Sequence, residues 1–330
     1  MTVHRYSILT YRTKGANANV VYTFTNPDRL PNPRWNFGGG GGGGFQGSTS
    51  GYTSGGAVVN IIDKFPFATN ANASDVGDMS VKRAFVSGQS SSTNGYSSGG
   101  GYDPNFKFNT IDKFPFASNA NATDVGDITV TRYGTAGQSS TTSGYASAGY
   151  AVTGGYPTVF NVIDKFPFSS DANATDAGDV TVSRGFVAGQ TSTTNGYSSG
   201  GSFSVSARID KFPFASDANA TNVGSLSAAR GMVTGQSSTT DGYTSGGDAP
   251  GAVNIIDKFP FASDANATDV GDLTVSRRHV AGQSSTASGY TSGGGASLNI
   301  IDKFPFASNA NATDVGDLTQ GRYGPAGQQI

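Results

Sequence analysis

Cysteine is absent from this chain of 330 residues, and several other reactive residues are scarce. Without Cys, thiol catalysis and thiolate metal sites are excluded, and the fold does not depend on disulfides. Glutamate is also absent, and the only histidines are His4 and His279. We expect both histidines to be surface residues, because general-base catalysis needs a partner within hydrogen-bonding reach. The carboxylates recur in similar segments and form no distinct acid–base pair, so we expect no enzyme.

Charge and hydrophobicity remove further classes of function. The formal net charge is −2, which gives no electrostatic case for nucleic-acid binding. No apolar stretch approaches the ~20 residues that a membrane-spanning helix needs. The N-terminus also lacks the apolar core of a signal peptide. We therefore expect neither a nucleic-acid partner nor a membrane span.

The hexapeptide Ile-Asp-Lys-Phe-Pro-Phe occurs six times, always inside a longer repeated segment. Its Asp falls at Asp63, Asp112, Asp164, Asp210, Asp257 and Asp302. A period of roughly 50 residues is typical of a fold in which one small unit is laid against the next. Features that are identical in all six units are expected to be architectural. A specific site is expected where the units differ.

Composition indicates β-structure, since Gly, Ser, Thr, Val, Phe and Tyr are abundant and favour strands and tight turns over helices. In the fifth repeat we expect strands at 242–247, 254–261, 272–277 and 281–285. The equivalent of residues 119–127, rich in Asn, Asp and Gly, is expected to be a folded loop. Four short strands per repeat predict an all-β, six-bladed β-propeller.

The two ends of the repeat region are in matching phase. Residues 46–56 resemble the end of one repeat and the start of the next, and the chain stops at Gly-Pro-Ala-Gly-Gln-Gln-Ile, where a further repeat would begin. A linear array needs distinct capping units at its ends. We therefore expect a ring over residues 46–330, closed by strands from both termini.

Two family resemblances follow from these motifs. The repeat resembles the kelch repeat in its Tyr followed by a double glycine, as in Tyr96 with Gly99 and Gly100, and in the Arg that closes a later strand. These arginines are Arg83, Arg132, Arg184, Arg230, Arg277 and Arg322. Kelch units carry a Trp where this chain has Phe-Pro-Phe. Residues 46–330 also resemble repeat proteins of marine bacteriophages, especially viruses of cyanobacteria, which implies a virion component.

The first 45 residues differ from the repeats. Residues 6–25 carry two apolar, strand-prone runs, and the linker at 38–45 is mostly glycine, which behaves as a flexible spacer. We expect residues 1–37 to be an attachment arm that binds other virion proteins or the same arm in a homo-oligomer. An extension that docks on its own propeller is the alternative.

Sequence variation is concentrated in the link between the double glycine and the Ile-Asp-Lys strand. Insertions within a repeat map to loops on one face, which is often the binding face. The links of the second and third repeats carry the candidate ligand-binding residues Tyr102, Phe106, Phe108, Tyr150, Tyr156 and Phe160. Exposed aromatic rings there could stack on sugars or dock a partner protein. Covering the blade edges is the alternative role.

Two sets of repeated polar residues give further candidates. Asp171, Asn173, Thr175 and Asp179 place oxygen atoms at loop positions 1, 3, 5 and 9, a spacing that resembles calcium loops. An Asn- and Asp-rich turn that caps backbone N–H groups is the alternative to calcium, and no other cofactor is expected. Asp63, Lys64, Arg83 and their counterparts are expected to be buried in ion pairs. A ring of six arginines around an axial channel, as an anion site, is the alternative.

These observations favour a non-enzymatic structural or attachment protein of a virion, joined to the capsid, neck or tail by residues 1–37. The alternative is a module that recognises host-surface glycan through the aromatic links of the second and third repeats. Both hypotheses place the protein in the virion.

Overall fold

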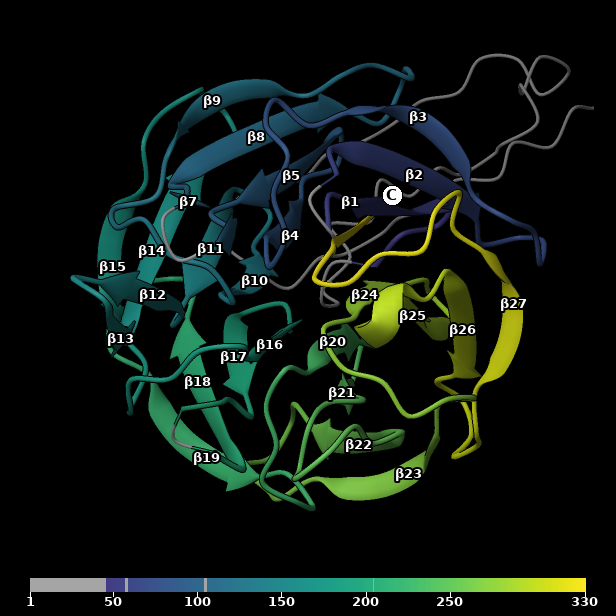
Figure 1. Ribbon diagram of the computed structural model, residues 1–330. Helices are drawn as coiled ribbons and strands as arrows, with labels where there is room; N and C mark the ends of the chain where they lie inside the picture. Colours follow the sequence, from purple (N-terminus) through teal and green to yellow (C-terminus); the bar gives the residue numbers. More distant parts are fainter. Residues whose placement is uncertain (1–45, 57–58, 104–105, 204) are drawn as a thin grey trace, which may run out of the picture. The chain divides into compact units, whose positions relative to one another are not determined.

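The structure is a computed structural model that describes residues 46–56, 59–103, 106–203 and 205–330 (Figure 1). The predicted arm (1–37) and linker (38–45) lie outside the described residues, so the expectations about them stay predictions. In the described part, regular structure is β apart from one three-residue 3₁₀ segment, η2 (Gly295–Ser297).

Six four-stranded antiparallel sheets make up the repeats. The first strands are β4 (Ser87–Ser90), β10 (Ala136–Ser139), β16 (Ala188–Thr191), β20 (Thr234–Ser237), β24 (Ala281–Ser284) and β28 (Ala326–Gln329). The second strands are β1 (Ser50–Ser54), β5 (Asn94–Ser98), β11 (Ser143–Ser147), β17 (Asn195–Ser199), β21 (Asp241–Ser245) and β25 (Ser288–Ser292). The third strands are β2 (Ile61–Pro66), β8 (Thr110–Pro115), β14 (Val162–Pro167), β18 (Arg208–Pro213), β22 (Ile255–Pro260) and β26 (Ile300–Pro305). The fourth strands are β3 (Ser74–Asp78), β9 (Thr123–Asp127), β15 (Thr175–Asp179), β19 (Thr221–Ser225), β23 (Thr268–Asp272) and β27 (Thr313–Asp317).

The six sheets are arranged as the blades of a propeller. Each first strand contacts the first strands of the two neighbouring sheets, and the series β4, β10, β16, β20, β24, β28 returns to β4. These strands surround the axis, and the fourth strands lie at the rim (Figure 1). The predicted all-β, six-bladed propeller is confirmed. We number the blades from the one that contains β1, β2, β3 and β28.

Blade 1 combines strands from the two ends of the described chain. β1 pairs on one side with β2 and on the other with β28, for example Tyr52 opposite Gln328. The side chains of β1 are buried. The Tyr52 ring lies between blades, with its centroid 5.6 Å from that of Phe114 and 4.9 Å from that of Phe116. Similar Tyr–Phe–Phe clusters join the other blades, where they pack with buried Ile, Leu, Val and Ala side chains.

The position of the fourth strand differs from the sequence prediction. Residues 272–277 were expected to be a strand, but the strand is β23, Thr268–Asp272, in the segment expected to be a loop. The bulge between Ile256 and Asp257 lets β22 pair with this Gly-containing segment. Residues 273–277 instead cross from the rim back to the axis, burying Leu273 and Arg277. Leu273 and Arg277 are therefore packed between blades, while Val275 is 42% exposed.

The repeated Asp and Arg residues form buried ion pairs, as predicted. Arg184 Nη1 lies 2.8 Å from Asp210 Oδ2, and both side chains are fully buried. Thr181 donates its backbone N–H to the same carboxylate at 3.0 Å, and Arg184 Nη2 donates to the Ser198 carbonyl at 3.0 Å. Arg83 pairs likewise with Asp112, and Arg322 with Asp63. Each pair fixes the connection from one blade onto the next.

The repeated lysines are not buried, so that part of the prediction was wrong. Lys113, Lys165 and Lys211 retain 26–30% of their side-chain exposure and pair with an aspartate from the adjacent blade. Lys follows the buried Asp in the third strand, and successive residues of a strand point to opposite faces. The lysine therefore faces the outer loop of the next blade.

Ala148 occupies a position where the other five repeats have glycine. Its φ is 60°, and the equivalent Gly55, Gly99, Gly200, Gly246 and Gly293 have φ between 62° and 69°. A Cβ at those glycines would lie within 2.6–2.8 Å of an arginine carbonyl oxygen. The left-handed conformation is costly for any residue with a Cβ, so the alanine is strained.

We expect Ala148→Gly to raise the free energy of unfolding by about 1 kcal/mol, because the relieved strain exceeds the loss of one buried methyl group. Urea unfolding measures the change. The matched reciprocal variant, Gly200→Ala, should lower stability by a similar or larger amount. Equal stability of all three proteins would contradict the strain.

Candidate functional site

The axis of the propeller is too narrow to hold an organic ligand. The six first strands carry glycine at the same position, and a Cβ on any of them would lie 2.0–2.3 Å from the carbonyl oxygen of the equivalent glycine in a neighbouring blade. These residues are Gly88, Gly137, Gly189, Gly235, Gly282 and Gly327. Two cavities of about 50 and 90 Å³ lie along this channel, which is space for a few water molecules. A sugar or nucleotide must bind elsewhere.

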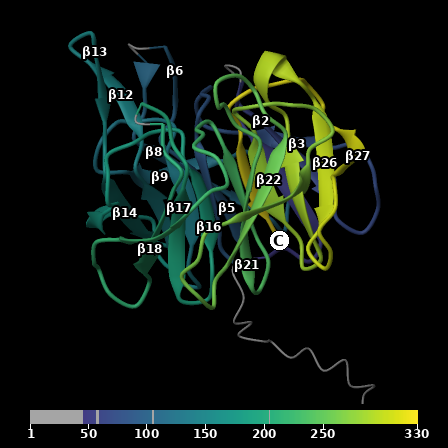
Figure 2. The same ribbon diagram turned by 90° about the horizontal axis from the view of Figure 1, so that it is seen from below.

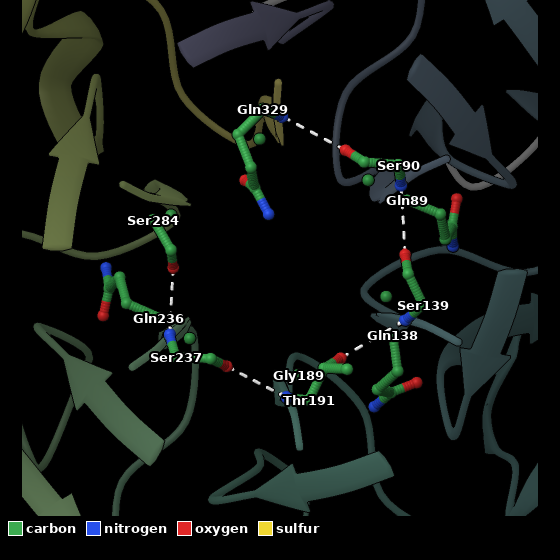
Figure 3. Close-up of a pocket in the computed structure, with 15 residues that line it drawn as sticks. Gln89, Ser90, Gln138, Ser139, Gly189, Thr191, Gln236, Ser237, Ser284 and Gln329 are labelled. Carbon is green, nitrogen blue, oxygen red and sulfur yellow. Dashed lines mark hydrogen bonds between the residues drawn. The ribbon is translucent and has the colours of Figure 1, made fainter. Parts of the chain in front are cut away.

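A chain of hydroxyl groups surrounds one end of the channel (Figure 3). Ser90 donates its backbone N–H to the Ser139 hydroxyl at 3.0 Å, and the pattern continues around the axis through Thr191, Ser237 and Ser284. Gln329 stands in the sixth place and donates its N–H to the Ser90 hydroxyl at 3.1 Å. We call this end of the propeller, with the short turns that follow these residues, the turn face.

The alternative of an arginine-lined channel is wrong. The residues that line the two axial cavities are small, polar or aliphatic, and none of the six repeated arginines is among them. Each arginine is buried beside its aspartate instead. The described part of the chain therefore has no ring of cations on the axis.

The opposite end of the channel carries a ring of six residues, one from each blade. We call it the axial ring: Phe85, Gly134, Phe186, Met232, His279 and Gly324. All six have φ between 55° and 67°. Each donates its backbone N–H to the carbonyl oxygen of the preceding member at 2.6–2.9 Å, and the sequence of bonds returns to its start. This end is the loop face, because the variable links between second and third strands begin beside it.

Three rings of the axial ring meet over the channel. The centroids of Phe85 and His279 are 4.9 Å apart, and Phe186 lies 5.4 Å from each of them. They come from alternate blades, and a Cβ at Gly134 or Gly324 would strike the Phe186 or Phe85 ring. The small residues therefore leave room for the neighbouring rings, and the rings shut the channel.

His279 is not the surface residue expected from the sequence. Burial, with a smaller contribution from the Arg278 charge, lowers the pKa of its imidazole to about 4. Its Nε2 is buried without a hydrogen-bond partner. The imidazole is therefore neutral at neutral pH and lies among aromatic rings, where it acts as an apolar closing group.

The predicted aromatic residues belong to two links on the loop face, those of the second and third repeats. The second-repeat link forms a hairpin, β6 (Gly101–Asp103) with β7 (Phe106–Lys107). There Tyr102 stacks on Phe106 at 5.0 Å and 13°, with Phe108 beside it at 6.3 Å. The third-repeat link forms a second hairpin, β12 (Tyr150–Thr153) with β13 (Tyr156–Val159). Tyr156 is 76% exposed.

Tyr150 and Phe160 are less exposed than the sequence prediction expected. Tyr150 is 8% exposed, and Phe160 is half-buried. The two hairpins stand at one end of the propeller (Figure 2), and Lys107 Nζ of the first donates to the Val152 carbonyl of the second. The structure thus brings the two links together but does not expose all six rings.

Phe203, in the fourth repeat, was missed by the sequence analysis. Its ring stacks on Tyr150 at 4.1 Å and 4°, yet it is 51% exposed. Phe186 of the axial ring lies 6.0 Å from Phe203. The signal in the sequence is an aromatic residue two positions after Gly201, where the second repeat has Tyr102 after Gly100.

The residues of the calcium hypothesis have other partners. Asp171 pairs with Lys113, and Asn173 Oδ1 accepts the backbone N–H of Asp127 at 3.0 Å. Thr175 and Asp179 are the ends of strand β15. Every repeat has an Asn equivalent to Asn173 that caps the adjacent blade in this way. The loops therefore join blades, and calcium binding stays a prediction.

Within the described ranges, no three His, Cys, Asp or Glu side chains gather as a metal site would require. No helix in that part of the chain has the length and hydrophobicity to cross a membrane. In comparisons with known proteins, no family model matches the chain, and no curated protein is significantly similar to it. The fold defines the class, a six-bladed β-propeller.

Proposed function

We propose that the protein is a non-enzymatic attachment protein of a virion, in which residues 1–37 bind other virion proteins and the propeller is displayed outward. The observation that carries this proposal is the difference between the two faces of the propeller. The chain enters it on the turn face, and the variable aromatic links lie on the loop face.

The entry point is well anchored. Gln46 Nε2 donates to the carbonyl oxygens of Ser237 and Ser285 at 3.2 and 3.1 Å. Gly47 donates its N–H to the Ser284 carbonyl at 2.8 Å and pairs with Ser285 as an isolated bridge. Gln46 and Gly47 thus lie at the turn face, on the opposite side of the propeller from the variable links.

The resemblance of residues 46–330 to repeat proteins of marine bacteriophages supports the virion setting. The kelch resemblance, in repeat length and double-glycine motif, agrees with the propeller fold. The departure at Phe-Pro-Phe is explained by the packing described above. These two phenylalanines fill the space between blades, where they contact the repeated Tyr.

Removing residues 1–44 is expected to leave a folded propeller that no longer joins particles. The deletion stops short of Gln46 and keeps every contact described for the entry point. Mass spectrometry of purified particles, made with the full-length or shortened protein, measures incorporation. Circular dichroism and thermal unfolding check that the propeller is intact. Particles that contain the shortened protein at the full-length level would contradict the proposal.

Glycan recognition on the host surface is the second candidate function. The stacked pair of Tyr102 and Phe106, 38% and 51% exposed, favours it, because a flat aromatic ring held in place binds at low entropic cost. Adsorption of particles to host cells with and without competing free glycan tests this function. Competition supports it, and adsorption unaffected by every glycan counts against it.

A further inference from the structure

We propose that Phe203, held flat against Tyr150, is the principal sugar-stacking ring of the loop face, and that its ligand is an uncharged pyranose ring of a glycan. This inference rests on the second candidate function above and extends it to a residue in the fourth repeat. Phe106 on Tyr102 supplies a second platform of the same construction.

Phe203 has a strained backbone and an exposed apolar side chain, and the fold itself requires neither. Its φ is 71°, in the left-handed region that a bulky residue rarely adopts. It is also half-exposed, so much of its apolar surface faces water. Backbone strain of this kind gathers at binding sites, where the surrounding structure holds the residue in place. Glycine would satisfy the backbone here, yet the chain has phenylalanine.

The two platforms share one design. In each, an outer Phe that is 51% exposed lies nearly parallel to a less exposed Tyr, with interplanar angles of 4° for Phe203 and 13° for Phe106. The Tyr covers one face of the Phe and fixes its orientation, while about half of the Phe residue stays exposed. Tyr156 is more exposed, but no ring among the described residues stacks on it. The stacked rings are therefore pre-organised, and Tyr156 lacks this support.

The exposed aromatic surface of the loop face consists of rings that each match the size of one sugar ring. The exposed rings are Tyr102, Phe106, Tyr156 and Phe203. At 38–76% exposure each, four such side chains present roughly 400 Å² in total. One half-exposed phenyl ring matches the apolar face of one pyranose ring.

The charge of the ring face favours an uncharged sugar. The face of an aromatic ring is the negative pole of its quadrupole, so it attracts C–H groups and repels carboxylates. Of the cations on this face, Arg278 pairs with Asp248, which neutralises its charge. Acidic sugars would therefore gain less here than neutral ones.

The test is binding of the full-length protein to an array of neutral, sialylated and uronic-acid glycans, followed by calorimetry on the bound ones. We expect a neutral glycan to bind and Phe203→Gly to weaken it by about tenfold or more. Phe203→Gly removes the strained side chain, so its melting temperature should not fall. A merely structural role for Phe203 would lower the melting temperature and leave affinity unchanged.

Two control variants make the result specific. Val205→Ala removes another exposed apolar side chain of the same link, 66% exposed, and should leave affinity unchanged. Phe203→Trp keeps an aromatic face and should retain binding. Equal affinity in the Phe203→Gly and wild-type proteins would overturn the proposal, as would binding only to acidic glycans, only to a peptide library, or to nothing.

These outcomes are separate from those of the virion proposal. Loss of glycan binding with normal incorporation into particles would refute the sugar site alone. Glycan binding that depends on Phe203, in a protein that never joins particles, would refute the virion role and leave the site standing.

Discussion

Deleting residues 46–56 is expected to unfold the whole propeller and not merely to loosen one blade. The deletion removes β1, which lies between β2 and β28 and is buried along its length. Loss of Tyr52 alone corresponds to about 3–5 kcal/mol, the usual cost of truncating a buried aromatic residue. The backbone pairing of five residues with β2 and of four residues with β28 is lost as well. Together these losses approach the 5–15 kcal/mol that stabilise a typical domain.

The deletion also breaks contacts with blade 6. Gln283 Nε2 of that blade donates to the Tyr52 carbonyl at 3.0 Å and to the Thr53 hydroxyl at 2.9 Å. Without β1, the edges of β2 and β28 are open, and open strand edges promote aggregation. Thermal unfolding with circular dichroism, compared with the 1–44 deletion as a control, measures the effect. A 46–56 deletion that melts like full-length protein would refute this role of β1.

A milder pair of variants tests whether the junction between the chain ends is as strong as the others. Tyr52→Ala and Tyr96→Ala remove equivalent rings, since Tyr96 lies 5.5 Å from Phe166 and 4.8 Å from Phe168. Because both side chains are 2% exposed, these two variants should lose the same free energy of unfolding if all blade junctions are equivalent.

Some features of the fold were visible in the sequence because repetition exposes them. Asp63 and Arg83 have counterparts in all six units. A charge that recurs in a packed repeat needs a partner, so the sequence predicted that these residues pair. The loop face could be located from the varying links for the same reason. Repetition does not show the path of the chain. The sequence prediction therefore placed the fourth strand at 272–277, in the connection, and a loop where β23 lies.

The axial ring shows why single residues were misjudged. His279 looks unremarkable in its own repeat. Compared across repeats, its position holds Gly134 and Gly324 in two units and large side chains in the other four. Glycine in some copies indicates a left-handed backbone, which places the position at a tight and unusual turn. Phe203 lacked this signal, because no repeat has glycine at the second position after the double glycine, and only its likeness to Tyr102 marked it.

Lowering the pH from 7 to 4 is expected to destabilise the wild-type protein by about 2–3 kcal/mol more than the His279→Phe variant. The pKa of His279 in the folded protein is about 4, and the imidazole in an unfolded chain titrates near 6.5. The stabilising effect of the neutral ring is complete above pH 6.5. It is lost as the pH falls from 6.5 towards 4, because the unfolded state binds the proton first. Each unit of pKa difference corresponds to about 1.4 kcal/mol.

The phenylalanine variant is a matched control because Phe85 and Phe186 hold the equivalent positions with φ of 57° and 55°, against 56° for His279. Its backbone should therefore be accommodated without added strain. His4 and every carboxylate are present in both proteins, so their contributions cancel in the difference between the two unfolding free energies. Urea unfolding at half-unit steps between pH 4 and 8 measures that difference. Parallel pH profiles for the two proteins would show that the His279 imidazole is not enclosed by Phe85 and Phe186 in solution.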